Sequence, residues 1–340
     1  MTTGKLREKY LNFFKKPPRN HQEISPAPLV PEGDPTTLFT SSGMQQLMPN
    51  LLAESHPQGR RLLNSQPCLR LEDIDKIGDN RHITFFEMLG NWSLGVVVSP
   101  GPGSLHLKFL VKELQFPKDR LYVSVFKGTK EIPRDEESAA IYKKLGIPEK
   151  RISYYGLKEN WWSRSGPPSQ MPAGEIGGPD SEIFYEFTQV KHNSKFGKKC
   201  QPNCDCGRFL EIGNSVFIQY QKKEDGSLVE LPRRNIDFGG GLERLTAAVN
   251  DNPDIFQIDV FRPIISLLEK KTGISYGLYP RKDISFRIIS DHLRAAVALL
   301  SAGVYPSNKQ QGYILRRLIR KAVVEMHQLG DEIVTLELSE

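Results

Sequence analysis

The most constraining feature of the sequence is the segment NIDFGGGLERLT at residues 235–246, in which three glycines separate two apolar stretches. The pattern predicts a strand that carries Asp237 at its end, a turn of bare backbone at the glycines, and a helix with Arg244 in its first turn. Such a junction lets a flat ligand or a phosphate approach the main chain beside the positive end of a helix. An ordinary glycine-rich strand–helix junction is the alternative. The segment has neither the Gly-Lys-Ser/Thr of a P-loop nor the spacing of a dinucleotide-binding turn.

The composition is typical of a globular protein and gives no sign of a membrane-spanning one. The chain has 340 residues, of which 38% are hydrophobic and 25% are charged. No apolar run approaches the roughly 20 residues that cross a bilayer, and the basic N-terminus lacks the apolar region of a signal peptide. We therefore expect a cytoplasmic protein without a membrane partner. A net charge of +6 is compatible with a polyanionic partner.

Three of the four cysteines lie within seven residues, at Cys200, Cys204 and Cys206. This C-x3-C-x-C spacing, with His192 upstream, offers three thiolates and an imidazole, which can complete a tetrahedral structural Zn²⁺ site. Free thiols in a reducing compartment are the alternative. The four ligands leave no open position, so we do not expect a catalytic metal here.

Helices are predicted where apolar residues recur at helical spacing, and strands where they alternate. The predicted helices cover residues 6–14, 105–114, 135–145, 255–268, 285–302 and 312–326. The predicted strands cover residues 65–70, 81–91 and 121–126, with a strand pair within 208–220.

Two of these strands, residues 65–70 and 81–91, are joined by a charged loop and form a predicted hairpin. Arg70 lies near its base and Arg81 near its loop. Because a guanidinium group binds phosphate oxygens in a bidentate fork, the pair suits a triphosphate. A surface hairpin with solvated charges is the alternative.

Several segments resemble the alanyl-tRNA synthetase family of class II aminoacyl-tRNA synthetases. GGGLER, after the strand with Asp237, is similar to motif 3, and RHITFFEMLGN at residues 81–91 is similar to motif 2. LVPEGDPTTLFTSSGM at residues 29–44 resembles the N-terminal segment of that family and is the most specific match. The resemblance runs from about residue 6 to residue 328.

The resemblance implies an α+β fold, in which an antiparallel sheet flanked by helices is followed by a helical tRNA-binding segment. Residues 1–250 would form the catalytic domain, with a Cys-rich insert at 185–207. Residues 251–340 would begin the domain that recognises the tRNA acceptor stem. Full-length family members continue into editing and C-terminal domains, so we expect a short form. Whether it is natural or a piece of a longer chain stays open, as does the oligomeric state.

The resemblance also implies ATP as a substrate and Mg²⁺ as a cofactor. Arg70 and Arg244 would be the catalytic residues: Arg70 would hold the α-phosphate and the substrate carboxylate, and Arg244 would stack on adenine and reach the γ-phosphate. The remaining ATP-binding residues would be Arg81, Met88, through its main chain, and Gly241. Glu211 is a candidate Mg²⁺ ligand, since Mg²⁺ takes one or two carboxylates together with phosphate oxygens.

For L-alanine, the resemblance implies that Asp237 holds the ammonium group. The other residues of the amino-acid pocket would be Trp162, Asn214, Val216 and Gly239. Gly213 departs from the family pattern, which has tryptophan there, so this pocket is either roomier or filled by another side chain. Asp180 also departs from it, because many members have cysteine at that position.

For the tRNA(Ala) acceptor stem, Asn308 aligns with the asparagine that recognises a G·U pair. Phosphate contacts would come from a basic helix with Arg316, Arg317 and Arg320. The implied activity is that of an alanine--tRNA ligase. A stand-alone enzyme that passes alanine to another acceptor is the alternative. A catalytically silent RNA-binding relative is disfavoured because Arg70, Arg244 and Asp237 are all present.

Overall fold

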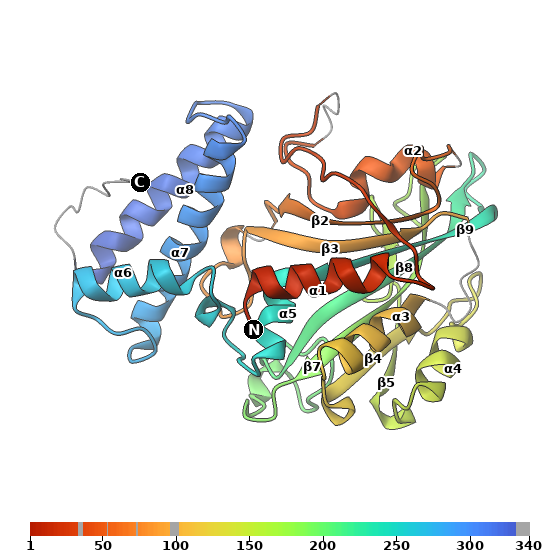
Figure 1. Ribbon diagram of the computed structural model, residues 1–340, viewed down its shortest axis with the longest axis horizontal. Helices are drawn as coiled ribbons and strands as arrows, with labels where there is room; N and C mark the ends of the chain where they lie inside the picture. The colour runs from red at the N-terminus through yellow and green to blue at the C-terminus, as the bar shows by residue number, and fades with distance from the viewer. Residues whose placement is uncertain (33–36, 53, 73, 96–101, 331–340) are drawn as a thin grey trace.

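A computed structural model describes residues 1–32, 37–52, 54–72, 74–95 and 102–330. Within these residues the chain forms a nine-stranded sheet in the order β1-β2-β3-β9-β8-β7-β4-β5, with β6 paired to β7 (Figure 1). The strands are β1 (Gln22–Glu23), β2 (Arg61–Leu69), β3 (Phe85–Ser93), β4 (Leu121–Phe126), β5 (Ile152–Tyr155), β6 (Trp161–Ser163), β7 (Ile176–Glu186), β8 (Phe209–Lys222) and β9 (Leu228–Gly241). All neighbours from β2 to β4 are antiparallel, and only the outer pairs β1–β2 and β4–β5 are parallel.

Helices cover one face of this sheet. They are α1 (Thr3–Lys15), α3 (Pro102–Lys108), which continues as a π-helical turn at Phe109–Glu113, α4 (Glu136–Lys144) and α5 (Leu242–Val249). Apolar side chains of α1 and α5, such as Tyr10 and Leu245, pack with Leu89 and Ile183 of the sheet in the largest hydrophobic core. The short helix α2 (Met48–Leu51) packs in a separate core with Trp92.

Three further helices follow the sheet: α6 (Arg262–Thr272), α7 (Pro280–Ser301) and α8 (Gln310–Leu329) (Figure 1). They join the sheet region through apolar packing and through a buried contact at Asp291 of α7. This carboxylate accepts hydrogen bonds from the Thr84 amide at 2.7 Å and hydroxyl at 2.6 Å. The α+β fold with a helical C-terminal part is therefore as predicted. No helix among the described residues is both long enough and apolar enough to cross a membrane.

The predicted turn at the three glycines is wrong. Gly239, Gly240 and Gly241 belong to β9 and pair with Gly90, Leu89 and Met88 of β3. A Cβ atom on Gly239 would lie 2.9 Å from the Met88 sulfur, so the absence of a side chain there lets Met88 pack against the backbone of β9. The helix after them, α5, begins at Leu242 and has Arg244 in its first turn, as predicted.

Other boundaries also differ from the sequence prediction. β3 begins at Phe85 and not at residue 81, because Asp79 accepts the Arg81 and His82 amides at 3.0 and 2.8 Å and so draws them out of the ladder. The predicted strand pair within 208–220 is the single long strand β8.

The predicted helix at 255–268 is interrupted. A short 3-10 turn, Ile255–Gln257, precedes α6, which begins at Arg262 with a proline in its first turn.

Candidate functional site

A cavity of about 630 Å³ lies on the face of the sheet opposite the main core. Alternation along the strands places it there: Phe86 and Met88 of β3 line the cavity, whereas Leu89 faces the core. Every residue assigned above to ATP or alanine lines this cavity, together with Glu211. The assigned residues are Arg70, Arg81, Met88, Trp162, Asn214, Val216, Asp237, Gly239, Gly241 and Arg244.

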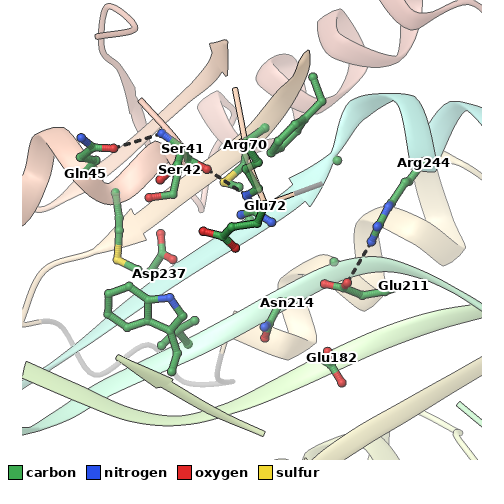
Figure 2. A pocket seen from close by; sticks show the side chains of 18 of the residues that line it. Ser41, Ser42, Gln45, Arg70, Glu72, Glu182, Glu211, Asn214, Asp237 and Arg244 are labelled. Carbon is green, nitrogen blue, oxygen red and sulfur yellow. Dashed lines mark hydrogen bonds and ion pairs between the residues drawn. The ribbon is translucent and has the colours of Figure 1, made fainter. Parts of the chain in front are cut away.

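Arginines reach the cavity from separate segments, and Figure 2 shows Arg70 and Arg244. Arg70 follows β2, donates from Nε to the Ser41 carbonyl at 3.1 Å and lies over the Phe86 ring at 5.1 Å. Arg244 of α5 pairs with Glu211 of β8 at 3.0 Å. With Arg81 and Arg164, which also line it, four arginines bring permanent positive charge to one cavity, which suits a polyphosphate.

Asp237 is a deeply buried acid of the cavity, with 7% of the residue exposed. No ion pair involving it exists among the described residues. Burial raises the pKa of Asp237 to about 7. Trp162 and Val216 line the same cavity. A buried carboxylate without a cationic partner is suited to bind a positively charged ligand group.

Gly213 does not leave an open space. A Cβ atom there would lie 2.7 Å from two ring carbons of Phe238, and the Phe238 ring itself stacks on His106. Phe238 therefore occupies the volume that a side chain at position 213 would need. Phe238 belongs to the main core and does not line the cavity, so it does not fill the amino-acid pocket.

Met88 presents its thioether to the cavity, where the sulfur accepts the Gly43 amide at 3.3 Å. Its main chain lies in mid-strand, paired with Gln66 of β2 and Gly241 of β9. A ligand at this position would therefore meet the Met88 side chain before the backbone.

Three carboxylates gather on β7 and β8 near Arg244. Burial raises the pKa of Asp180 to about 7, although Asn160 and Asn214 donate hydrogen bonds to it at 3.0 and 3.4 Å. Burial, with the nearby charge of Glu211, also raises the pKa of Glu182 well above its usual range. Asp180 thus holds Asn214 in place, while Glu182 and Glu211 face the cavity.

Sequence reasoning missed several lining residues, among them Ser41, Gln45, Glu182 and Glu243. Ser41 belongs to the segment at residues 29–44, which is the most specific family match. That match could have pointed to Ser41, but it implied no binding role for this residue. Gln45 accepts the Ser41 amide at 3.1 Å and so fixes the carbonyl that holds Arg70 (Figure 2). Glu243 is buried and pairs with Arg294 of α7.

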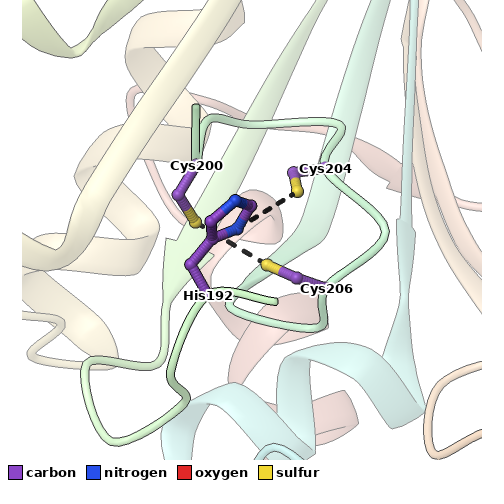
Figure 3. A group of neighbouring side chains, drawn as sticks. All are labelled: His192, Cys200, Cys204 and Cys206. Atoms are coloured by element: carbon purple, nitrogen blue, oxygen red, sulfur yellow. Dashed lines mark hydrogen bonds between the residues drawn. The ribbon is translucent and has the colours of Figure 1, made fainter. Parts of the chain in front are cut away.

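The Cys-rich insert brings His192, Cys200, Cys204 and Cys206 together, with their ligand atoms all within 4.8 Å of one another (Figure 3). The Cys200 and Cys206 sulfurs are 3.6 Å apart, near the roughly 3.8 Å that Zn–S bonds of 2.3 Å impose in a tetrahedron. His192 Nδ1 lies 3.8 Å from the Cys204 sulfur.

The outer nitrogen of His192 is also engaged, since Nε2 lies 2.8 Å from the Gly197 carbonyl. A proton donated there leaves the Nδ1 lone pair free for a metal. The donor set therefore fits Zn²⁺.

The residues assigned to tRNA lie outside the cavity, within α8 and just before it. Arg316 donates a hydrogen bond to the exposed Asn308, and Arg317 pairs with Asp75 at 2.6 Å. Arg320 is exposed on the same helix.

Comparison with known proteins gives the same family as the motifs. A family model described as "tRNA synthetases class II (A)" matches residues 5–337. The chain is similar to the "Alanine--tRNA ligase" proteins of Borreliella afzelii (46% identity over 97% of this chain and 54% of that protein) and Treponema denticola (44%, with the same coverage). It spans about half the length of these curated relatives.

Among solved structures, the histidyl-tRNA synthetase of S. aureus matches with 13% identity and a TM-score of 0.39, over 76% of this chain and 67% of the other. With the family match over residues 5–337, the chain belongs to the class II tRNA synthetases.

Proposed function

We propose that this chain binds ATP and L-alanine in the cavity, forms alanyl-adenylate and transfers the alanyl group to tRNA(Ala). The observation that carries the proposal is the buried Asp237 carboxylate, which has no ion-pair partner among the described residues and shares one cavity with Arg70, Arg81 and Arg244. The carboxylate suits the ammonium group of an amino acid, and the arginines suit the triphosphate. Trp162 and Val216 would confine a side chain as small as a methyl group.

In the first step, a carboxylate oxygen of alanine attacks the α-phosphorus of ATP, the bond to the bridging oxygen breaks, and pyrophosphate leaves. The attacking carboxylate is already ionised at neutral pH, so no general base is needed. Catalysis then depends on positioning and on stabilising charge. Arg70 would hold the α-phosphate and the reacting carboxylate, while Arg81 and Arg244 would hold the outer phosphates.

The donor set of the cavity fits Mg²⁺. Glu182 and Glu211 both line it, and their carboxylates are close enough for the charge of one to raise the pKa of the other. Such a pair offers the hard oxygen ligands that Mg²⁺ shares with phosphates. When bound, the ion would supply positive charge against the phosphates; Glu211 would meanwhile orient Arg244.

In the second step, a hydroxyl of the terminal ribose attacks the alanyl carbonyl and AMP leaves. Asn308 would contact the acceptor stem, with Arg316, Arg317 and Arg320 bound to phosphates in a salt-dependent manner.

The proposed division into a catalytic domain at 1–250 and the start of a tRNA-binding domain at 251–340 follows these roles. We also assign one structural Zn²⁺ to the Cys-rich insert and a cytoplasmic location to the protein.

The test is aminoacylation of tRNA(Ala) run beside alanine-dependent pyrophosphate exchange. The proposal expects both activities. Exchange without any charging of tRNA(Ala) would instead support the alternative in which alanine passes to another acceptor. Absence of exchange with every amino acid would refute the proposal.

A further inference from the structure

The Cys-rich insert does more than close a loop, because its tip contacts two residues that line the cavity. We propose that residues 200–206, held by a metal ion on His192 and the three cysteines, form a support behind the cavity that positions Arg81 and Glu182 for ATP. This inference rests on the proposed function for its substrate. It makes Asn203 and Asp205 positioning residues and the metal a determinant of ATP affinity.

The first contact joins the insert to Arg81, 124 positions earlier in the chain. Arg81 Nη2 donates to the Asp205 carbonyl at 3.0 Å and lies 3.4 Å from its carboxylate. Asp205 stands between Cys204 and Cys206, so a metal bound to both sulfurs fixes the carbonyl between them. The Asp205 side chain is 75% exposed, and an exposed ion pair contributes little. The backbone contact is therefore the part that the metal controls.

The second contact joins the insert to Glu182. Asn203 Nδ2 donates to Glu182 Oε2 at 3.2 Å, and the Ser124 hydroxyl donates to the same oxygen at 2.9 Å. Asn203 has φ of 65°, in the left-handed region that asparagine tolerates better than most residues. This conformation, one residue before Cys204, turns the amide toward the cavity.

The base of the insert is anchored independently of the metal. Arg208 pairs with Glu186 at 2.6 Å and donates to the Val190 carbonyl at 2.9 Å. The tip has, besides the two contacts above, a hydrogen bond from the Tyr155 hydroxyl to the Pro202 carbonyl at 2.8 Å. Loss of the metal should consequently release the tip while the sheet stays folded, because structural metals supply much of the order of small loops.

Loss of the metal should affect the binding of ATP but not the binding of alanine. Arg81 and Glu182 lie with Glu211 and Arg244 in the part of the cavity assigned to the phosphates, whereas Asp237 is assigned to the amino acid. A released tip should weaken ATP binding and leave alanine binding unchanged. Losing a well-placed charge-assisted hydrogen bond corresponds to about a tenfold change in affinity.

The experiment compares the holoenzyme, the protein treated with a zinc-selective chelator, and Cys204→Ser. For each, zinc content, ATP binding by calorimetry, and KM for ATP and alanine in pyrophosphate exchange are measured. We expect about one zinc per chain in the holoenzyme. Its loss should raise the Kd and KM for ATP about tenfold with KM for alanine unchanged. A purified protein without zinc, unchanged ATP binding after zinc loss, or equal rises in both KM values would overturn the proposal.

A second variant keeps the proposal testable if Cys204→Ser fails to fold. Asn203→Asp keeps the size and backbone preference of the side chain but removes the donor to Glu182, so ATP binding should weaken while zinc is retained. Asn193→Asp, in the same insert, is the matched control: Asn193 accepts the Lys195 amide through its side-chain oxygen, which aspartate preserves. An equal effect of both changes would overturn the assignment.

A double-mutant cycle tests whether the metal acts through Arg81. In an Arg81→Ala background, zinc removal should weaken ATP binding by clearly less than in the parent; an undiminished effect would refute the route through Arg81. Calorimetry with ATP needs no amino acid or tRNA. Failure of exchange in the holoenzyme would therefore count against the proposed function, whereas zinc-independent ATP binding would count against this inference.

Discussion

Replacing Asp237 by asparagine should stabilise the free protein while it impairs alanine use. Asp237 is buried, has no ion-pair partner among the described residues, and has a pKa raised by burial to about 7 from an ordinary value of 3.8. Above pH 7 the folded protein therefore carries a desolvated charge that the unfolded chain solvates freely. Asparagine has nearly the same shape and no charge to desolvate.

The sign follows from proton linkage. A carboxyl group whose folded pKa lies above its unfolded pKa costs nothing at pH values below both, and its cost grows as the pH rises toward the folded pKa. Each pH unit in that window costs about 1.4 kcal/mol, so the whole window costs about 4 kcal/mol for Asp237. The variant's gain in unfolding free energy should thus be about 2 kcal/mol larger near pH 8 than near pH 5.5.

The assay is urea unfolding of the free protein at both pH values, together with pyrophosphate exchange. Asp237→Asn should raise KM for alanine strongly and leave KM for ATP nearly unchanged, because the lost partner is the substrate ammonium. In the wild type, KM for alanine should rise as the pH falls below about 7, since only the ionised carboxylate attracts the ammonium. Asp119→Asn, an exposed aspartate, serves as the control and should change neither quantity. A gain in stability that is independent of pH, or a parallel loss of ATP affinity, would refute this account of Asp237.

Further predictions concern the charges, the metal, the packing and the RNA contact. Arg70→Ala should abolish adenylate formation, and pyrophosphate exchange that survives at near wild-type rates would contradict its role. Cys206→Ser should release about one Zn²⁺ per chain, as measured by metal analysis, with exchange reduced but not eliminated. Gly213→Ala should destabilise the protein by about 1–3 kcal/mol, because its Cβ meets the stacked Phe238 ring; thermal unfolding at the wild-type temperature would show that the ring can move. Asn308→Ala should reduce discrimination between G·U and G·C acceptor stems without affecting exchange, and retained discrimination would point to another residue.

Patterns of apolar residues in the sequence predicted the helices and strands that bury one face of their own segment. The strand at residues 121–126 has clear alternation and matches β4, and the apolar stripe of α1 is explained by burial of Leu6, Tyr10 and Phe14. The glycine triplet was different, because glycines suit both a turn and a close strand contact. The glycines form a strand because they pack against β3, which includes Met88, some 150 positions earlier in the chain. A pattern within one segment cannot show such a distant contact.

The same limit applies to the site. The residues that the family motifs named line one cavity, since the motifs carry residue identities. They did not carry the contacts between segments, such as Arg244 with Glu211 or Arg81 with Asp205, which are set by how distant strands and loops pack. The start of β3 was missed partly for this reason too, because, besides the local contacts of Asp79, Asp291 on α7 accepts the Thr84 amide.

The central claim is that the cavity selects alanine for activation by ATP. The most direct measurement is pyrophosphate exchange by the purified chain with each of the twenty amino acids in turn, compared by kcat/KM. The account predicts the highest value for alanine, with weaker activity for glycine and serine, because a small apolar pocket discriminates by only about 1–3 kcal/mol per methylene group. A higher value for a larger amino acid would show that the space beside Trp162 and Val216 accepts more than a methyl group, and would contradict the claim.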